Sequence, residues 1–335
     1  MMKRLHYARV QTASLYFFLC VALLLPVAGK SGIAQEPSAP AAQAAPERPP
    51  DESILLTVTV MDKKGNYVVG LNKSNFSLYS NKLQQEISSF NADDEPMSIG
   101  VLFDLSNSVT SWEHDNLMAA ANAFLRFVKL SHSANEYFVV GFGTRPSLLL
   151  DWTRGDKVAE EVQSKLNKVI VKGGATALFD ACYLGLEKVK SGSYRKQAIL
   201  LISDGLDSIS KYTFDDLRER FQETGIPLYS ICVYRNLSGG ILTREGQALL
   251  DTFSTISGGV AVFPDSKKKI DAAFEQIAIE LRHQYRLGFK PSKDKADGKW
   301  HSLKVKLTLA PGSPPAQSDL SVRSRTGYKA ARTLR

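Results

Sequence analysis

Apolar and polar residues alternate one by one in the first patterned region of this chain. Ile54, Leu56, Val58 and Val60 are separated by single residues, which is typical of a β-strand with one buried face. Similar short runs follow, bounded by turn residues. The pattern predicts strands over 53–61, 67–71, 76–79 and 86–90. Together they make an N-terminal β segment, which we place at residues 52–95.

From about residue 98 the pattern changes to apolar strands that alternate with helices. Leu117, Ala121, Phe124, Leu125 and Val128 recur at helical spacing and mark the first helix. Strands are predicted over 99–103, 137–142, 147–150, 198–202, 228–234 and 260–263, and the later helices over 176–189, 214–223, 245–253 and 267–284. This order predicts an α/β domain over 98–284 whose doubly wound, mostly parallel six-stranded sheet is covered by helices on both faces.

Alternation returns after residue 285 and predicts a C-terminal β segment over 285–328. Its strands are marked by Leu287 and Phe289, by the run from Leu303 to Leu309, and by Leu320 with Val322. Two or three strands alone are marginally stable in water, so neither β segment forms a convincing core by itself. We therefore expect the two segments to pair as one small β-sandwich-like unit, with the α/β domain inserted between them.

The N-terminus has the pattern of an export signal. Lys3 and Arg4 precede an apolar stretch from about residue 15 to 28, and small residues before Gln35 offer a cleavage site after Ala34. A signal anchor is the alternative, but the stretch is shorter than the roughly 20 apolar residues that a membrane span needs. We expect a signal peptide over 1–34, a Pro- and Ala-rich linker over 35–51, and a periplasmic or extracellular protein with no later transmembrane span.

Charge and cysteine content give little support for a nucleic-acid-binding protein or for a disulfide-bridged one. The formal net charge of +8 falls to half without the four basic residues of the signal region, which gives little support for nucleic-acid binding. Cys182 and Cys232 lie among apolar neighbours, where a free cysteine behaves as a small hydrophobic side chain. We expect buried thiols, although an exported protein permits a disulfide bridge.

Oxygen-bearing side chains follow two strands of the predicted sheet. Asp104, Ser106 and Ser108 close the strand over 99–103, and Asp204 closes the strand over 198–202. Thr176 begins the helix that lies between them in the chain. In such sheets ligands bind at the carboxyl ends of the strands. Two nearby carboxylates repel each other unless a cation or a proton lies between them. An all-oxygen set suits Mg²⁺, Mn²⁺ or Ca²⁺ and is a poor cage for zinc or copper.

These motifs resemble the von Willebrand factor type A (VWA) domain, and in particular the bacterial exported proteins called VWFA-related. Asp104, Ser106 and Ser108 match the Asp-x-Ser-x-Ser motif, and Thr176 and Asp204 match the other two positions of the metal-ion-dependent adhesion site, or MIDAS. The resemblance implies that these residues bind a divalent cation, most often Mg²⁺. It also implies that an acidic residue of a protein partner fills the open coordination position, as expected of a binding and adhesion module rather than an enzyme.

Other readings of the same residues stay open. Each of the serines, Thr176 or Asp204 could alone serve as a helix cap or a turn residue. Asp207 is expected to order its loop rather than to bind the ion. The chain has no Gly-x-Ser-x-Gly elbow and no phosphate-binding loop, and Ser106 stands where a dehalogenase-type phosphatase would have a second aspartate. A metal-dependent hydrolase and a structural envelope protein with an idle ion site remain alternatives, and the sequence does not indicate the oligomeric state.

Overall fold

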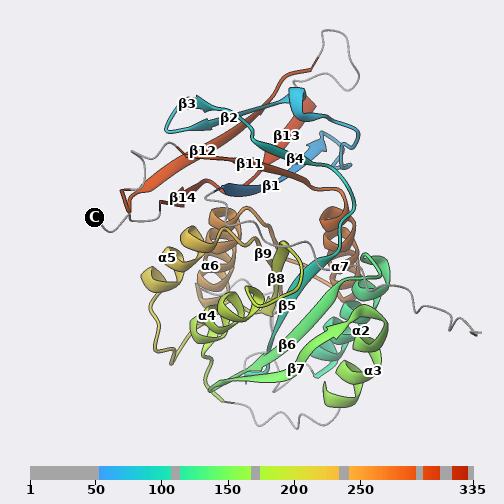
Figure 1. Ribbon diagram of the computed structural model, residues 1–335. Coiled ribbons are helices and arrows are strands. Elements are labelled where there is room, and N and C mark those ends of the chain that lie inside the picture. Colours follow the sequence, from blue (N-terminus) through green and yellow to red (C-terminus); the bar gives the residue numbers. More distant parts are fainter. Residues whose placement is uncertain are drawn as a thin grey trace, which may run out of the picture. The chain divides into compact units, whose positions relative to one another are not determined.

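The computed structural model describes residues 53–106, 114–166, 174–233, 241–291, 297–309 and 319–330 (Figure 1). All of these residues belong to one unit by their contacts, which spans residues 44–335. The predicted signal peptide over 1–34 and the predicted linker over 35–51 lie outside the described residues. None of the described helices is long and apolar enough to cross a membrane.

A six-stranded sheet forms the centre of the α/β domain, with its strands in the order β10-β9-β8-β5-β6-β7. The strands are β5 (Met97–Asp104), β6 (Glu136–Phe142), β7 (Pro146–Arg154), β8 (Lys196–Ser203), β9 (Leu228–Cys232) and β10 (Ala261–Val262). Neighbouring strands are parallel except β6 and β7, which are antiparallel. The predicted doubly wound, mostly parallel sheet is therefore confirmed.

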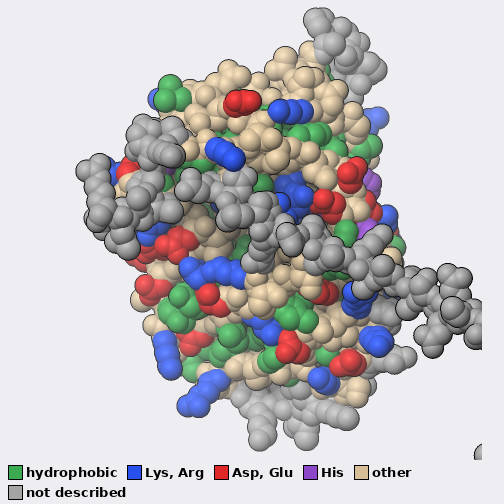
Figure 2. All heavy atoms as spheres, in the orientation of Figure 1, with side chains coloured by type: hydrophobic (Ala, Val, Ile, Leu, Met, Phe, Trp, Pro, Cys, Tyr) green, Lys and Arg blue, Asp and Glu red, His purple; other side chains and the backbone are tan. Residues whose placement is uncertain are grey.

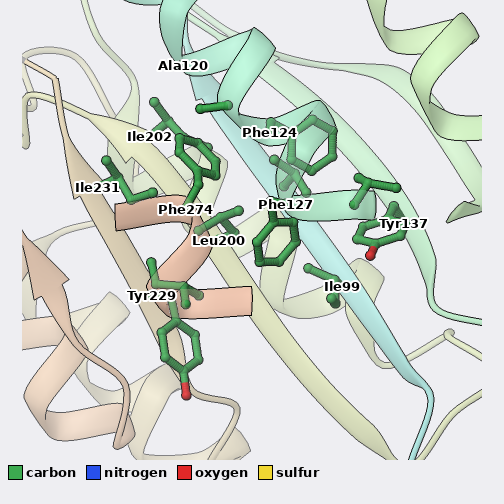
Figure 3. Packing of buried hydrophobic residues seen from close by; sticks show 14 of the residues in the cluster. Ile99, Ala120, Phe124, Phe127, Tyr137, Leu200, Ile202, Tyr229, Ile231 and Phe274 are labelled. Carbon is green, nitrogen blue, oxygen red and sulfur yellow. The ribbon is translucent and has the colours of Figure 1, made fainter. Parts of the chain in front are cut away.

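Helices cover both faces of this sheet. The first face carries α2 (His114–Leu130), α3 (Gly155–Leu166) and α7 (Lys267–Arg282), and the second carries α4 (Leu178–Val189), α5 (Phe214–Thr224) and α6 (Ile241–Ser257). Figure 3 shows Phe124 and Phe127 of α2 and Phe274 of α7 packed against the sheet. Every residue of β5 is buried, because that strand lies between two apolar layers.

The flanking segments form two four-stranded antiparallel sheets. The first has the order β13-β1-β11-β4 and the second β14-β12-β2-β3. Their strands are β1 (Ile54–Asp62), β2 (Phe76–Ser80), β3 (Leu83–Gln85), β4 (Ser89–Asn91), β11 (Tyr285–Phe289), β12 (Trp300–Leu307), β13 (Leu320–Arg323) and β14 (Gly327–Lys329). Each sheet combines strands from before and after the α/β domain, and their apolar faces share one core. The predicted pairing of the two flanks is thus confirmed.

Several local predictions were wrong. The expected strand over 67–71 makes only one isolated bridge, between Tyr67 and Met61. The Tyr285 hydroxyl replaces strand pairing there, because it donates to the Val68 carbonyl at 2.8 Å and accepts from the Leu71 amide at 3.1 Å. Three elements were not anticipated among the described α-helices and strands: α3, β3 and β14. Among the side chains of α3 whose burial is described, Val158 and Val162 lie in the core, and this apolar stripe was too narrow to be recognised.

The two described cysteines, Cys182 and Cys232, are buried and are not bridged, as predicted. Burial raises the pKa of each thiol above its ordinary value, and a nearby aspartate adds to the effect in both cases. Neither thiol is therefore a reactive nucleophile.

The β unit contacts the α/β domain at the amino ends of the parallel strands. Glu280, near the end of α7, accepts hydrogen bonds from Thr59 of β1 at 3.0 Å and from Tyr229 of β9 at 2.9 Å. Arg323, the last residue of β13, forms an ion pair with the same carboxylate. A single buried acid therefore ties together a helix, a sheet strand and two strands of the β unit.

Arg325 forms a second connection between the β unit and the α/β domain. Its guanidinium donates to the Leu55 carbonyl at 2.8 Å and lies so close to Gly225 that a side chain there would collide with it. Gly225 is the left-handed C-cap of α5, with φ of 63°. A cation at the end of a helix interacts favourably with the carbonyl dipoles of that terminus. The site predicted from the sequence lies at the opposite, carboxyl ends of the strands.

Candidate metal site

Asp104 is the last residue of β5 and is completely buried, with 0% of its surface exposed. One carboxylate oxygen, Oδ1, accepts the backbone N–H of Ser106 at 2.9 Å. The other, Oδ2, accepts the hydroxyl of Ser203 at 2.6 Å. The carboxylate is therefore held in one orientation by its own turn and by the neighbouring strand.

The end of β8 brings a second acid to the same edge. Phe103 of β5 pairs with Ile202 of β8, so Asp104 and Ser203 end two parallel strands side by side, and Asp204 follows directly. Asp204 accepts the Leu206 amide on Oδ1 at 3.0 Å. Ser203 also accepts the Gly205 amide at 3.0 Å, so its hydroxyl fixes both the Asp104 carboxylate and the turn. Our sequence analysis missed Ser203, although a serine at a strand end beside two aspartates was a signal.

The electrostatics of Asp104 reflect this crowding. Burial, and then the negative charge of Asp204, raise the pKa of the Asp104 carboxyl to about 7, against the opposing hydrogen bonds from Ser106 and Ser203. Both effects penalise the ionised form, because the charge is removed from water and faces a like charge. A cation between the two carboxylates would relieve the repulsion. The charge distribution thus fits the predicted ion.

Thr176 is fixed to the same edge by backbone hydrogen bonds. Its amide donates to the Ser208 hydroxyl at 2.8 Å, and the Ser208 amide donates back to the Thr176 carbonyl at 2.9 Å. The next amide, that of Ala177, donates to the Gly143 carbonyl at 2.8 Å, just beyond the end of β6. The loop before α4 therefore bridges the ends of β6 and β8, which places Thr176 at the edge that carries Asp104 and Asp204.

The loop after Asp204 is ordered by its own side chains. Asp207 accepts the Phe179 amide of α4 at 3.2 Å and also accepts the Ser210 hydroxyl. Asp180 of α4 accepts the amides of Lys211 and Tyr212 at 2.8 and 3.1 Å. These reciprocal bonds join the loop to the first turn of α4. They support the prediction that Asp207 orders the loop.

A close contact between two glycines packs α6 behind the site. Gly205 has φ of +83°, a conformation that glycine adopts without strain, and a side chain on it would strike the backbone of Gly246 in α6. A side chain on Gly246 would in turn strike the Asp204 carbonyl. Only a residue without a Cβ fits at either position, so this pair sets how closely α6 approaches the Asp204 turn.

The described structure therefore brings Asp104, Ser106, Thr176 and Asp204 to one edge of the sheet. Ser108, the fifth predicted ligand, lies outside the described residues. The described part of the chain holds no group of three or more His, Cys, Asp or Glu side chains that could bind a metal. The donors at this edge are two carboxylates and hydroxyl groups, which is the chemistry that Mg²⁺, Mn²⁺ or Ca²⁺ prefers. That these residues bind an ion stays a prediction.

A family model for the von Willebrand factor type A domain matches residues 99–206. This range begins in β5 and ends two residues after Asp204. The chain contains a von Willebrand factor type A domain. The VWA domain named from the sequence motifs is thus confirmed, as is its fold. No curated protein matches the sequence.

Solved structures share a limited similarity with the chain. A von Willebrand factor type A protein from Catenulispora acidiphila has a TM-score of 0.43 at 10% identity, and the match covers 83% of this chain and 74% of that protein. An aerotolerance-related membrane protein from Bacteroides fragilis has a TM-score of 0.43 at 17% identity, covering 55% of this chain and 98% of the other.

Proximal thread matrix protein 1 from the mussel byssus, in a structure with a zinc-occupied MIDAS motif, has a TM-score of 0.46 at 14% identity. The match covers 56% of this chain and 48% of the mussel protein. Similarity at this level does not extend to what those proteins bind.

Proposed function

We propose that this VWA protein is an exported binding module that recognises a protein partner through a divalent cation, most favourably Mg²⁺. The cation would be held by Asp104, Ser106, Ser108, Thr176 and Asp204. One observation carries the proposal: two acids end adjacent strands at one edge, inside a set of oxygen donors. Such a pair is costly to keep ionised without a cation.

Each residue would have a distinct role at the ion. The hydroxyls of Ser106, Ser108 and Thr176 would be neutral ligands, and the carboxylates of Asp104 and Asp204 would balance the charge directly or through water. Two negative charges against a divalent cation leave a site of low net charge. When bound, the cation would supply an open coordination position for a carboxylate of the partner.

Binding, rather than catalysis, is the role that the surroundings of Asp104 favour. Its described hydrogen-bond donors, the Ser106 amide and the Ser203 hydroxyl, orient the carboxylate, and Asp207 and Ser208 hold the loops beside it. These contacts would hold the oxygen donors in place around the proposed ion. Export is proposed on the basis of the basic and apolar pattern of residues 1–34.

Calorimetric titration of the full chain with Mg²⁺ tests the metal site. The wild-type protein is expected to bind one ion, and Asp104→Ala or Asp204→Ala to abolish binding with the circular dichroism spectrum unchanged. Asp151→Ala is the matched control, because Asp151 is an exposed aspartate of β7 that pairs with Lys188 on the surface. Equal affinity in the wild type and both site variants would refute the site.

Partner capture tests the binding role separately. Immobilised wild-type protein is expected to retain proteins from the exported fraction of its source cells in Mg²⁺, to release them in chelator, and to recover them when Mg²⁺ is restored. Asp104→Ala should retain none of them. Capture that survives both the chelator and the substitution would favour a structural envelope role with an idle ion site.

A further inference from the structure

An apolar rim lies along the loop that follows Asp204, between β8 and α5. It consists of Ile209, Tyr212, Phe214 and the supporting Tyr183 of α4. Ile209 is 45% exposed and Tyr212 is 37% exposed, although both are large hydrophobic residues. Phe214 is exposed to a similar degree. Large apolar side chains that gather on a surface mark an interaction site more often than scattered ones do.

The rim is attached directly to the candidate site. The Ile209 amide donates to the Thr176 carbonyl at 3.3 Å, and the preceding Ser208 amide donates to the same oxygen. Thr176 is one of the proposed ligands, so backbone hydrogen bonds join the loop of the rim directly to the candidate site. The rim therefore continues the surface that the proposed function already uses.

Aromatic contacts support the rim from below. Tyr212 stacks on Tyr183 with ring centroids 3.8 Å apart and planes 10° from parallel. The Arg220 guanidinium carbon lies 5.5 Å from the centroid of the Tyr183 ring. The ring centroids of Phe214 and Phe253 are 4.9 Å apart. Asp180 holds the backbone amide of Tyr212, as described above. An aromatic surface that is already ordered loses little entropy when a partner covers it.

Acidic and basic side chains are mixed on this face and bond to one another or to loop amides. The carboxylates of the face serve within the fold, since Asp180 accepts loop amides, Asp216 accepts the Thr213 amide at 2.8 Å, and Asp215 pairs with Arg218 at 3.0 Å. Lys211 is exposed between Ile209 and Tyr212. Figure 2 shows hydrophobic side chains over α4 and α5 among charged side chains of both signs.

We infer that the rim recognises a bulky apolar residue close to the acidic residue that would bind the ion. The partner is thus an extended protein segment with a glutamate or aspartate and, two positions later, a phenylalanine or leucine. In an extended segment, side chains two positions apart point to the same side. This inference rests on the proposed function, because the acid must first be seated on the cation.

Bead-bound synthetic peptides test the inference with the full chain in Mg²⁺. The first peptide carries glutamate with phenylalanine two positions later, the second replaces the phenylalanine by serine, and the third replaces the glutamate by glutamine. The wild-type protein is expected to be captured about tenfold more by the first peptide than by the second, and not above background by the third. Ile209→Ser and Tyr212→Ser should each reduce the ratio to about one.

Leu83→Ser is the matched control, because Leu83 is 62% exposed on β3 of the β unit. It should keep the wild-type ratio, and each variant should bind Mg²⁺ as the wild type does. If Mg²⁺ binds but the first two peptides capture equally, or neither captures, the rim inference is overturned and the ion site stands. If Mg²⁺ does not bind at all, the proposed function fails and the rim inference fails with it. Should Tyr212→Ser not fold, Ile209→Ser and the wild-type ratio decide the question.

Discussion

Two buried acids at opposite edges of the same sheet have opposite surroundings. Glu280, at the amino ends of the strands, is 1% exposed and forms an ion pair with Arg323 in addition to bonds from two hydroxyls. Asp104, at the carboxyl ends, is equally buried but contacts hydroxyl and amide donors and faces a second acid, Asp204. The charge of Glu280 is therefore matched within the described fold, whereas Asp104 faces a like charge that the proposed cation would balance.

The comparison separates two uses of a buried carboxylate. A buried charge is tolerated when it is paired and hydrogen-bonded, and Glu280 meets that condition. It connects the β unit to the α/β domain and contributes to the fold. An acid held beside another acid contributes no such stability on its own. Strands of eight residues separate the two edges by about 23 Å, at the usual rise of a β-strand. We therefore expect the edges to respond independently to substitution.

The largest expected change in stability comes from a substitution at the amino ends of the strands. Arg323→Met removes the ion-pair partner of Glu280 and leaves a buried charge uncompensated, which typically costs about 3–5 kcal/mol. We expect the free energy of unfolding in urea to fall by that amount. Lys63→Met is the control, because its pair with Asp319 is exposed and such pairs are worth about 0–1 kcal/mol. Equal losses in the two variants would mean that the Glu280 cluster is not a stabilising junction.

Matched removal of one charge from each edge should change stability in opposite directions. In chelator at pH 8, Glu280→Gln is expected to lower the free energy of unfolding by about 1–3 kcal/mol, since a hydrogen bond to a charged group is lost. Asp104→Asn should raise it by about 1–2 kcal/mol, because it removes a buried charge that Asp204 repels. Urea unfolding of both variants measures the two signs. If Asp104→Asn lowered the free energy of unfolding in chelator, Asp104 would stabilise the fold as Glu280 does, and the contrast between the two acids would be wrong.

Ser203 should matter for the ion and little for the fold. Its hydroxyl orients Asp104 at 2.6 Å, and loss of such a supporting hydrogen bond typically lowers metal affinity 10- to 100-fold. Ser203→Ala is therefore expected to weaken Mg²⁺ binding about tenfold in calorimetry. Ser191→Ala, which removes an exposed hydroxyl that accepts from Trp152, is the control and should bind as the wild type does. If Ser203→Ala bound Mg²⁺ with unchanged affinity, orientation of Asp104 by Ser203 would not contribute to metal binding.

Proton competition should give a smaller, graded effect. Because the pKa of Asp104 is raised to about 7, protons and cations compete for this carboxylate, and Mg²⁺ affinity should fall about tenfold from pH 8 to pH 6. Between pH 4 and pH 7, Asp104 keeps its proton in the folded chain but has lost it in the unfolded chain, where its pKa has the ordinary value of 3.8. In chelator, this group therefore lowers stability progressively as the pH rises from about 4 to 7. Asp104→Asn should lack both trends, and their persistence in that variant would assign them to another group.

The sequence predicted the fold wherever a local pattern carries the information. Strands such as Ile99 to Phe103 are continuous apolar runs, and Asp104 and Asp204 stand at their ends, so the edge that they share followed from the topology of a parallel sheet. The pairing of the flanks followed from their inability to form cores alone. Both predictions rest on contacts that follow from the pattern of a strand alone: pairing with a neighbouring strand and burial of its apolar face.

The parts that could not be predicted depend on side chains far apart in the sequence. Glu280 and Arg323 are 43 positions apart, and Ser203 meets Asp104 across 99 positions. Nothing in the local pattern of Arg325 indicates that its guanidinium lies against the C-cap of α5. Such contacts are decided by the packing of whole elements, so they emerge only when the elements are placed.

Diffraction from crystals of the protein grown with Mn²⁺, recorded at a wavelength where manganese scatters anomalously, tests the central claim most directly. Our account predicts one anomalous peak at the carboxyl edge, at coordination distance from the hydroxyls of Ser106 and Thr176 and beside the carboxylates of Asp104 and Asp204. Crystals of Asp104→Asn should lack that peak. A well-occupied manganese elsewhere with this edge empty, or an undiminished peak in Asp104→Asn, would contradict the account.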